Sequence, residues 1–267
     1  MFFIMKSALV LMLVFSFNLF AEELSDFDTY KKPYEKDELK SGSYYSKDET
    51  RAMEKDEFDN PGMIWVEKGN ELFNKKMGKN NYSCANCHNQ NNNSLIGIAV
   101  SYPIIHQNKL INLEQKINLC LENNMNLKTG PLESDNVLSL SSFITYLSKG
   151  LPMNVSIKGE AEEFFIRGKQ LYFERIGQMN LACNQCHDNL AGSYLRAERI
   201  SQGHINGFPS YLMRWENIAS VHKRFQFCNN QARAEPLEIG HADYNALQLY
   251  IAWRGNGLPL ESPSVRR

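Results

Sequence analysis

Cys84-Ala85-Asn86-Cys87-His88 and Cys183-Asn184-Gln185-Cys186-His187 are the two stretches that decide the fold of this 267-residue chain. Both follow the pattern Cys-x-x-Cys-His, in which two thiols can form thioether bonds to a haem and the next histidine can bind its iron. One such motif alone would also fit a redox-active dithiol or half of a zinc site. Two motifs, 99 residues apart, favour two covalently bound haem c groups.

The rest of the chain follows the same repeat. An aromatic-proline pair follows each motif, then a single cysteine, then an aromatic residue, then the sequence Gly-Leu-Pro. The matched segments are Tyr102-Pro103 with Phe208-Pro209, Cys120 with Cys228, Tyr146-Leu147 with Tyr250-Ile251, and Gly150–Met153 with Gly257–Leu260. Helix-compatible apolar spacing before each motif predicts a mainly α protein with two cytochrome c-like helical domains and long loops, related by this internal repeat.

The sequence divides into four predicted parts: a signal peptide (1–21), a polar N-terminal arm (22–60), cytochrome c-like domain 1 (61–155) and cytochrome c-like domain 2 (156–267). The arm carries 13 acidic and 7 basic residues, together with more aromatic residues than a free tail needs. We therefore expect part of it to pack on the globular body. The turn residues Asn60-Pro61-Gly62 close the arm.

The N-terminus has the layout of a secretory signal peptide. Residues 8–20 are almost entirely apolar, follow Lys6, and end at Ala21 before two glutamates. The apolar stretch is too short for a comfortable membrane span, so we predict cleavage near Ala21, a periplasmic location and no membrane span in the mature chain. The formal net charge of -1 argues against a nucleic-acid partner.

The iron ligands follow in part from the motifs. His88 and His187 are the predicted proximal ligands, and Cys84, Cys87, Cys183 and Cys186 the predicted haem attachment points. Met125, Met213, His106, His204 and His222 are all possible distal ligands by residue type. However, cysteine is the residue that recurs at matching positions, so Cys120 and Cys228 are the predicted distal ligands. Thiolate ligation stabilises ferric iron and lowers the reduction potential.

Arginines distinguish the surroundings of Cys228 from those of Cys120. Arg224 lies four residues before Cys228, one turn away on a helix, and Arg233 and Arg254 follow it. Guanidinium groups lower the pKa of a nearby thiol and hold tetrahedral oxyanions through paired N–H donors. For Arg233 and Arg254, a role in a surface salt bridge explains their presence as well as anion binding does. Arg224 is therefore the stronger candidate for an anion-binding residue.

A combination of motifs in the second half resembles the SoxA family of the SoxAX cytochromes of bacterial thiosulfate oxidation. The resemblance covers nearly all of the chain after the signal peptide, because Asn60–Trp65 also matches the N-terminal segment of that family. The other motifs are Ser201–Pro209, His222–Phe225, Cys228-Asn229, Ala232–Pro236 and Tyr250–Pro259.

The resemblance implies an L-cysteine S-thiosulfotransferase that joins thiosulfate oxidatively to the carrier cysteine of SoxYZ. It implies that Cys228 is the catalytic residue and can carry a persulfide, and that Arg224 binds the substrate. Two electrons would leave through haem to the partner SoxX, in a heterodimer, and to other c-type cytochromes. Because Cys84, Cys87, His88 and Cys120 are all present, the chain resembles the dihaem form of the family.

Two other functions fit the haem motifs. A dihaem periplasmic electron carrier of the cytochrome c4 type would use Met ligands and have no functional thiol at the haem face. A dihaem peroxidase would need an open iron site. Electron paramagnetic resonance separates the first from a thiolate-ligated enzyme, and a peroxide-consumption assay separates the second.

Overall fold

The computed structural model describes residues 32–88 and 95–267, so the predicted signal peptide lies outside the described residues. The chain divides into two compact units, residues 1–33 and residues 34–267, and the second unit carries both Cys-x-x-Cys-His motifs. No helix in the described ranges has the length and apolar composition of a membrane span. The boundary near residue 155 between two cytochrome domains stays a prediction.

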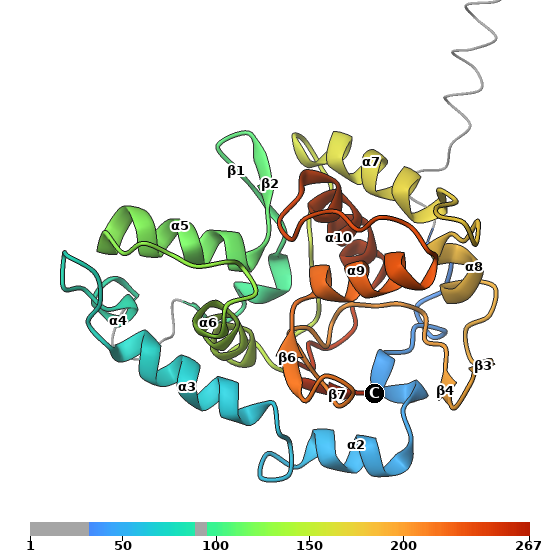
Figure 1. Ribbon diagram of the computed structural model, residues 1–267, viewed down its shortest axis with the longest axis horizontal. Helices are drawn as coiled ribbons and strands as arrows, with labels where there is room; N and C mark the ends of the chain where they lie inside the picture. The colour runs from blue at the N-terminus through green and yellow to red at the C-terminus, as the bar shows by residue number, and fades with distance from the viewer. Residues whose placement is uncertain (1–31, 89–94) are drawn as a thin grey trace, which may run out of the picture. The chain divides into compact units, whose positions relative to one another are not determined.

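The second unit is mainly helical, as predicted, with short antiparallel hairpins between the helices (Figure 1). The helices are η1 (Gly42–Tyr45), α2 (Asp48–Lys55), α3 (Met63–Asn74), α4 (Cys84–Cys87), η3 (Ala99–Ser101), α5 (Leu113–Met125), α6 (Asp135–Tyr146), α7 (Ala161–Phe173), α8 (Cys183–His187), α9 (Val221–Gln231) and α10 (Ala242–Arg254). The strands are β1 (Ile104–His106), β2 (Lys109–Ile111), β3 (Tyr194–Leu195), β4 (Glu198–Arg199), β5 (Ser210–Leu212), β6 (Asn217–Ala219) and β7 (Ser264–Arg266).

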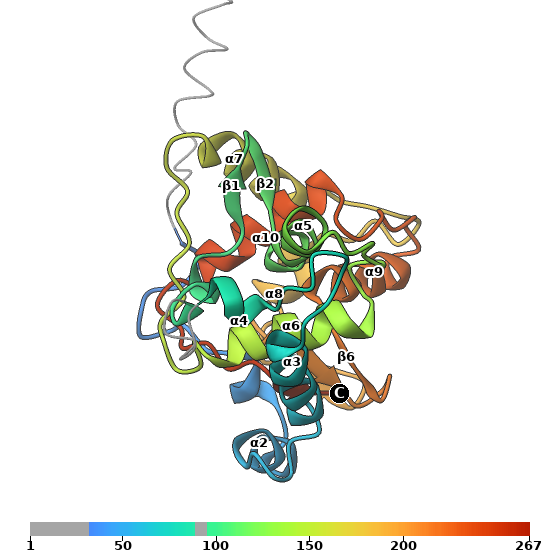
Figure 2. The same cartoon turned by 90° about the vertical axis from the view of Figure 1, so that its left-hand side faces the viewer.

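Two helix pairs, α3 with α6 in the first half and α7 with α10 in the second, make the most extensive helix contacts (Figures 1 and 2). Each pair meets at a glycine. A Cβ atom added to Gly69 would lie 2.0 Å from the Ser139 carbonyl oxygen, and one added to Gly168 would lie 2.0 Å from that of Ala246. Only glycine allows this contact between backbones.

The helix crossings also correct one detail of the repeat. Phe143 packs against Gly69 where Tyr250 packs against Gly168, so Phe143 is the residue that corresponds to Tyr250. The predicted match of Tyr146 with Tyr250 is therefore wrong by about one helical turn. The reason is that aromatic residues recur on α6, and only the helix crossing shows which of them faces the partner helix.

The two Gly-Leu-Pro segments that end the halves pair with each other. Pro152 and Pro259 form an antiparallel bridge. The Gly150 and Met153 N–H groups donate to the carbonyls of Leu260 and Leu258, both at 2.8 Å. One hydrophobic core also contains side chains from both halves. The two repeats are therefore joined by apolar contacts as well as by this backbone pairing.

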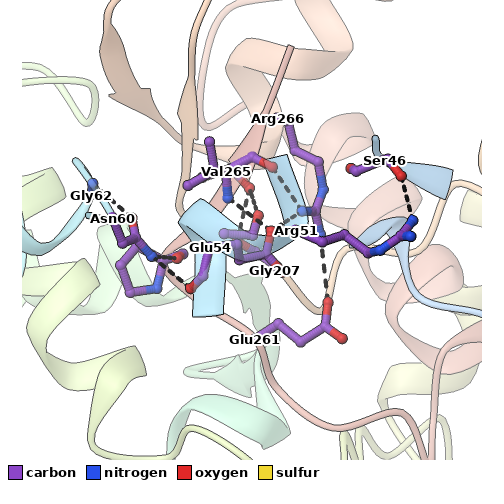
Figure 3. Close-up of polar contacts among 12 residues, drawn as sticks. Ser46, Arg51, Glu54, Asn60, Gly62, Gly207, Glu261, Val265 and Arg266 are labelled. Carbon is purple, nitrogen blue, oxygen red and sulfur yellow. Dashed lines mark hydrogen bonds and ion pairs between the residues drawn. The ribbon is translucent and has the colours of Figure 1, made fainter. Parts of the chain in front are cut away.

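Part of the N-terminal arm, from Tyr34 to Asn60, packs on the second half, as expected from the aromatic content of the arm. Glu54 of α2 is buried and accepts a hydrogen bond from the Val265 N–H at 2.9 Å, and it also pairs with Arg266 (Figure 3). Asn60 donates to the Pro263 carbonyl at 2.9 Å. The arm therefore holds the C-terminal strand β7, which pairs with β5 in parallel.

We expect Glu54→Gln to lower the free energy of unfolding by about 2 kcal/mol, because it removes one charge from a buried, hydrogen-bonded ion pair. Guanidinium unfolding followed by circular dichroism would measure the change. Asp48→Asn is the control, since Asp48 forms an exposed ion pair with Arg51 and such pairs contribute little. Equal unfolding midpoints for the two variants would contradict a structural role of Glu54.

Candidate haem and thiol site

The turn before each Cys-x-x-Cys-His motif is anchored to the helix that carries the distal cysteine. In the second half, the Met179 N–H donates to the Ala232 carbonyl at the end of α9, at 3.1 Å. In the first half, the Asn80 N–H donates to the Met125 carbonyl at the end of α5, at 3.2 Å. These bonds hold each motif next to the helix that carries the predicted distal cysteine of the same half.

The thiols of Cys120 and Cys228 lie near enough to the first cysteine of their motifs to raise its pKa. Burial raises the pKa of the Cys183 thiol to about 12, and the nearby Cys228 adds to the rise. Burial likewise raises the pKa of Cys84 to about 11, with a contribution from Cys120. All six cysteines lie within the described ranges and none of them forms a disulfide.

His187 has the ring orientation that its predicted role as an iron ligand requires. Its Nδ1 lies 2.8 Å from the Ser201 carbonyl oxygen, an acceptor that requires the proton on Nδ1 and leaves the Nε2 lone pair free. Gly203, at φ +77°, lies against the ring, and a Cβ atom there would be 2.8 Å from His187 Cγ. Burial lowers the pKa of His187, and the positive charges of Arg224 and Arg254 lower it further.

Arg224 lies on α9 one turn before Cys228, as the spacing predicts. Its positive charge contributes to lowering the pKa of His187, so its side chain lies near the second motif. The guanidinium carbon is 5.0 Å from the centre of the Phe227 ring. Arg224 is partly buried, whereas Cys228 is exposed at the surface of the described chain.

The first half carries a cation at the corresponding position. Lys116 follows the N-cap Asn112 of α5 by four residues, just as Arg224 follows the N-cap Ser220 of α9. Lys116 also lowers the pKa of the cysteine and the histidine of its own half, although burial is the larger effect on both. The two halves therefore share one arrangement and differ in the type of cation.

Arg254 is almost completely buried, with 1 % of its surface exposed. It pairs with Asp188, which also accepts a hydrogen bond from Tyr172 at 2.9 Å, and its guanidinium lies 4.2 Å from the centre of the Tyr172 ring. Within residues 32–88 and 95–267, its Nε and Nη1 atoms have no hydrogen-bond partner. Two unpartnered donors beside His187 are suited to an anionic group.

Arg233 has a different structural role. It adopts a left-handed conformation, φ +54°, just beyond α9, and its carbonyl accepts a hydrogen bond from the Gln178 N–H at 3.3 Å. Asn126, at φ +52°, accepts the corresponding bond in the first half. The backbone of Arg233 therefore helps to anchor the motif, while its side chain is exposed and its predicted substrate contact stays a prediction.

Among the other candidate ligands, His222 has the clearest environment. It is fully buried between Phe225 and Tyr244, and its Nδ1 accepts the Gly240 N–H at 3.0 Å. Burial lowers its pKa to about 4, so it is a neutral core residue. The remaining candidates are placed as follows: His106 ends β1, Met125 ends α5 in the core, His204 is buried beside Gln202, and Met213 follows β5.

Sequence reasoning missed the contact between the N-terminal arm and the loop around His187. The Tyr34 hydroxyl donates to the His187 carbonyl at 2.7 Å. Gln202, next to the Ser201 carbonyl that orients His187, accepts from the Lys40 N–H at 2.7 Å and donates to the Glu38 carbonyl at 2.9 Å. No local pattern could reveal this, because the partners are more than 150 positions apart.

The residues around the second motif fit a covalently bound haem. Among the described residues, the imidazole Nε2 of His187 has no hydrogen-bond partner, and Arg254 presents donors without one. Gly203 leaves room for the ring of His187. The thiols of both motifs are unpaired and Cys228 lies close by. This donor set defines a c-type cytochrome.

Comparisons with known proteins agree. A family model described as SoxA/TsdA, cytochrome c domain, matches residues 68–153. The chain is 40 % identical to the L-cysteine S-thiosulfotransferase subunit SoxA of Paracoccus pantotrophus, over 86 % of this chain and 80 % of that protein. The same subunit of Rhodovulum sulfidophilum is 36 % identical, over 86 % and 81 % of the two chains. The chain therefore belongs to the SoxA family.

A solved structure extends the likeness to three dimensions. The crystal structure of SoxXA from P. pantotrophus has a chain that superposes with a TM-score of 0.83 at 39 % identity, covering 86 % of this chain and 87 % of that one. At this level of identity and coverage, the two chains share one fold.

Proposed function

We propose that this chain is the dihaem SoxA subunit of an L-cysteine S-thiosulfotransferase, which couples thiosulfate oxidatively to the carrier cysteine of SoxYZ. The observation that carries the proposal is the position of Cys228 and Arg224 on one face of α9, beside the second haem motif. Curated relatives that are named as subunits of an L-cysteine S-thiosulfotransferase support it. SoxX is the proposed partner in a heterodimer.

Each half would hold one haem c. Cys84 and Cys87, and likewise Cys183 and Cys186, would form the thioether bonds. His88 and Cys120 would be the axial ligands in the first half, and His187 and Cys228 those in the second. When bound, the haem supplies a one-electron acceptor next to the reacting sulfur. Arg254 would then be placed to hold either an acidic group of the cofactor or the substrate.

The overall reaction joins a carrier thiol and thiosulfate into a cysteine S-thiosulfonate, and it releases one proton and two electrons. Cys228 would form a sulfur–sulfur bond with the outer sulfur of thiosulfate as two electrons leave to c-type acceptors. The carrier thiolate would then attack that outer sulfur, and Cys228 would depart as a thiolate. Arg224 would hold the sulfonate oxygens through paired N–H donors during both steps.

Arg224→Ala should raise the KM for thiosulfate about 50-fold, because it removes a charge-assisted contact to the substrate that contributes about 2–3 kcal/mol. The assay follows thiosulfonate formation on purified SoxYZ by mass spectrometry, with the haem-loaded SoxAX complex and an oxidised c-type acceptor. Lys116→Ala, at the matching position of the first half, should leave this KM within about twofold. A KM that rises equally in both variants would argue against Arg224 as the substrate-binding residue.

Export to the periplasm is part of the proposal. It rests on the apolar stretch at residues 8–20 and on the cytochrome c class, whose haem attachment occurs outside the cytoplasm. Mass spectrometry of the purified mature chain would give the cleavage site near Ala21 and the number of attached haems together. A mature chain with a single haem would remove the dihaem assignment.

A further inference from the structure

The hairpin that precedes α9 has a longer turn than its counterpart in the first half. β1 and β2 are joined by the two residues Gln107 and Asn108, both with positive φ, at 49° and 59°. β5 and β6 are joined by four residues, 213–216. The longer turn adds Arg214 and Trp215, which have no counterpart in the first half.

These two residues reach α9 and contact the residue next to Cys228. The rings of Trp215 and Phe227 pack edge to face at 5.7 Å. The Arg214 guanidinium carbon lies 5.5 Å from the centre of the Phe227 ring, and that of Arg224 lies 5.0 Å from the same centre. We call Arg214, Trp215, Arg224 and Phe227 the Phe227 cluster.

Arg214 and Arg224 lie at the same Phe227 ring, and an aromatic ring does not neutralise their positive charges. Throughout the described ranges, neither Arg214 nor Arg224 takes part in a salt bridge, and their ring contacts leave the N–H donors available. Stacking on an aromatic face restrains each guanidinium, so less conformational entropy is lost when it binds a ligand. Two restrained cations at one ring, without a salt-bridge partner among the described residues, offer positive charge and N–H donors to a compact anion.

The corresponding region of the first half lacks these features. Leu119 takes the place of Phe227, Lys116 that of Arg224, and a two-residue turn that of Arg214 and Trp215. The shared framework, with a cysteine, a cation and a haem motif, is the same in both halves. The Phe227 cluster is therefore an addition at the half that carries Cys228.

We propose that Arg214 is a second substrate-binding residue, which together with Arg224 holds the sulfonate end of thiosulfate while the outer sulfur faces Cys228. The inference deepens the proposed function and rests on it. A sulfonate has three oxygens, so two guanidinium groups can each donate a pair of N–H groups to it. A site of this kind favours a tetrahedral oxyanion over a halide or a neutral thiol.

The test is calorimetric titration of thiosulfate into the haem-loaded SoxAX complex, without carrier or electron acceptor, followed by steady-state coupling assays. Arg214→Gln should raise the Kd and the KM for thiosulfate about tenfold, equivalent to about 1.4 kcal/mol, and should leave kcat within about twofold. Arg214→Lys should fall between the wild type and Arg214→Gln, because it retains the charge and loses the paired donors.

Arg175→Gln is the matched control, since Arg175 is an exposed arginine outside the Phe227 cluster and its replacement makes the same change in net charge. Equal Kd values for Arg214→Gln and Arg175→Gln would overturn the inference and leave the proposed function intact. If the wild-type complex forms no thiosulfonate on SoxYZ, the proposed function itself fails. Phe227→Leu, which introduces the residue type of the first half, should also weaken binding.

Discussion

Replacing Cys228 with alanine is expected to lower the coupling of thiosulfate to SoxYZ by at least about 10³-fold, because the substitution removes the sulfur that forms the covalent bond. On the proposed dihaem assignment both haems should stay attached, since the proposed attachment cysteines belong to the two motifs and not to α9. The coupling rate and the haem content per chain are the two measurements. The paramagnetic resonance signal of one haem should change with the loss of its axial thiolate.

Cys120→Ala is the informative comparison for this variant. It removes the cysteine at the matching position of α5, so it too would change the signal of one haem. Because the first half has no Phe227 cluster, we expect its effect on coupling to be much smaller than that of Cys228→Ala. Full coupling activity in Cys228→Ala would refute the mechanism and would favour a plain electron carrier of the cytochrome c4 type.

Gly203→Ala is expected to lower coupling at least about 100-fold by displacing His187, because a shift of about 1 Å in a reacting group can have an effect of this size. The added Cβ would lie 2.8 Å from Cγ and 2.9 Å from Nδ1 of the imidazole, well inside contact distance. Either the ring moves, or the loop with the Ser201 carbonyl moves. In both cases His187 loses the orientation that presents Nε2 to iron.

The spectroscopic readout separates this effect from a general loss of stability. Only the haem of the second half should change its axial ligation in the Gly203→Ala variant. Gly159→Ala is the control, because Gly159 has a similar backbone angle, φ +65° against +77°, with no atom within 4 Å of an added Cβ. If Gly159→Ala changes the haem spectrum as much as Gly203→Ala does, backbone strain and not contact with His187 is the cause.

The sequence was sufficient for those parts of the site that depend on local spacing. The two thiols and the histidine of a Cys-x-x-Cys-His motif lie within five residues, about one helical turn. The motif can therefore be recognised from the sequence without knowledge of the fold. The match of Cys120 with Cys228 was also visible, because a repeat preserves the order of elements even where other residues differ. The structure places both cysteines beside their motifs.

The arginines could not be ranked from spacing alone. Arg233 is near Cys228 in sequence, yet its side chain is exposed and its backbone anchors the motif. Arg254 is buried against Asp188. Arg214, on a different hairpin, comes to the same ring as Arg224.

Sequence by itself determined the class of protein, the attachment chemistry, the internal repeat and the pairing of one cysteine with each motif. These features depend on covalent order and on contacts within one or two helical turns. Only the tertiary structure decided which cations lie near Cys228 and which carbonyl orients His187. It also decided which aromatic residue packs against the glycine at each helix crossing. Such contacts join segments tens to hundreds of residues apart, and they are fixed by the packing of whole helices and hairpins, which no local pattern records.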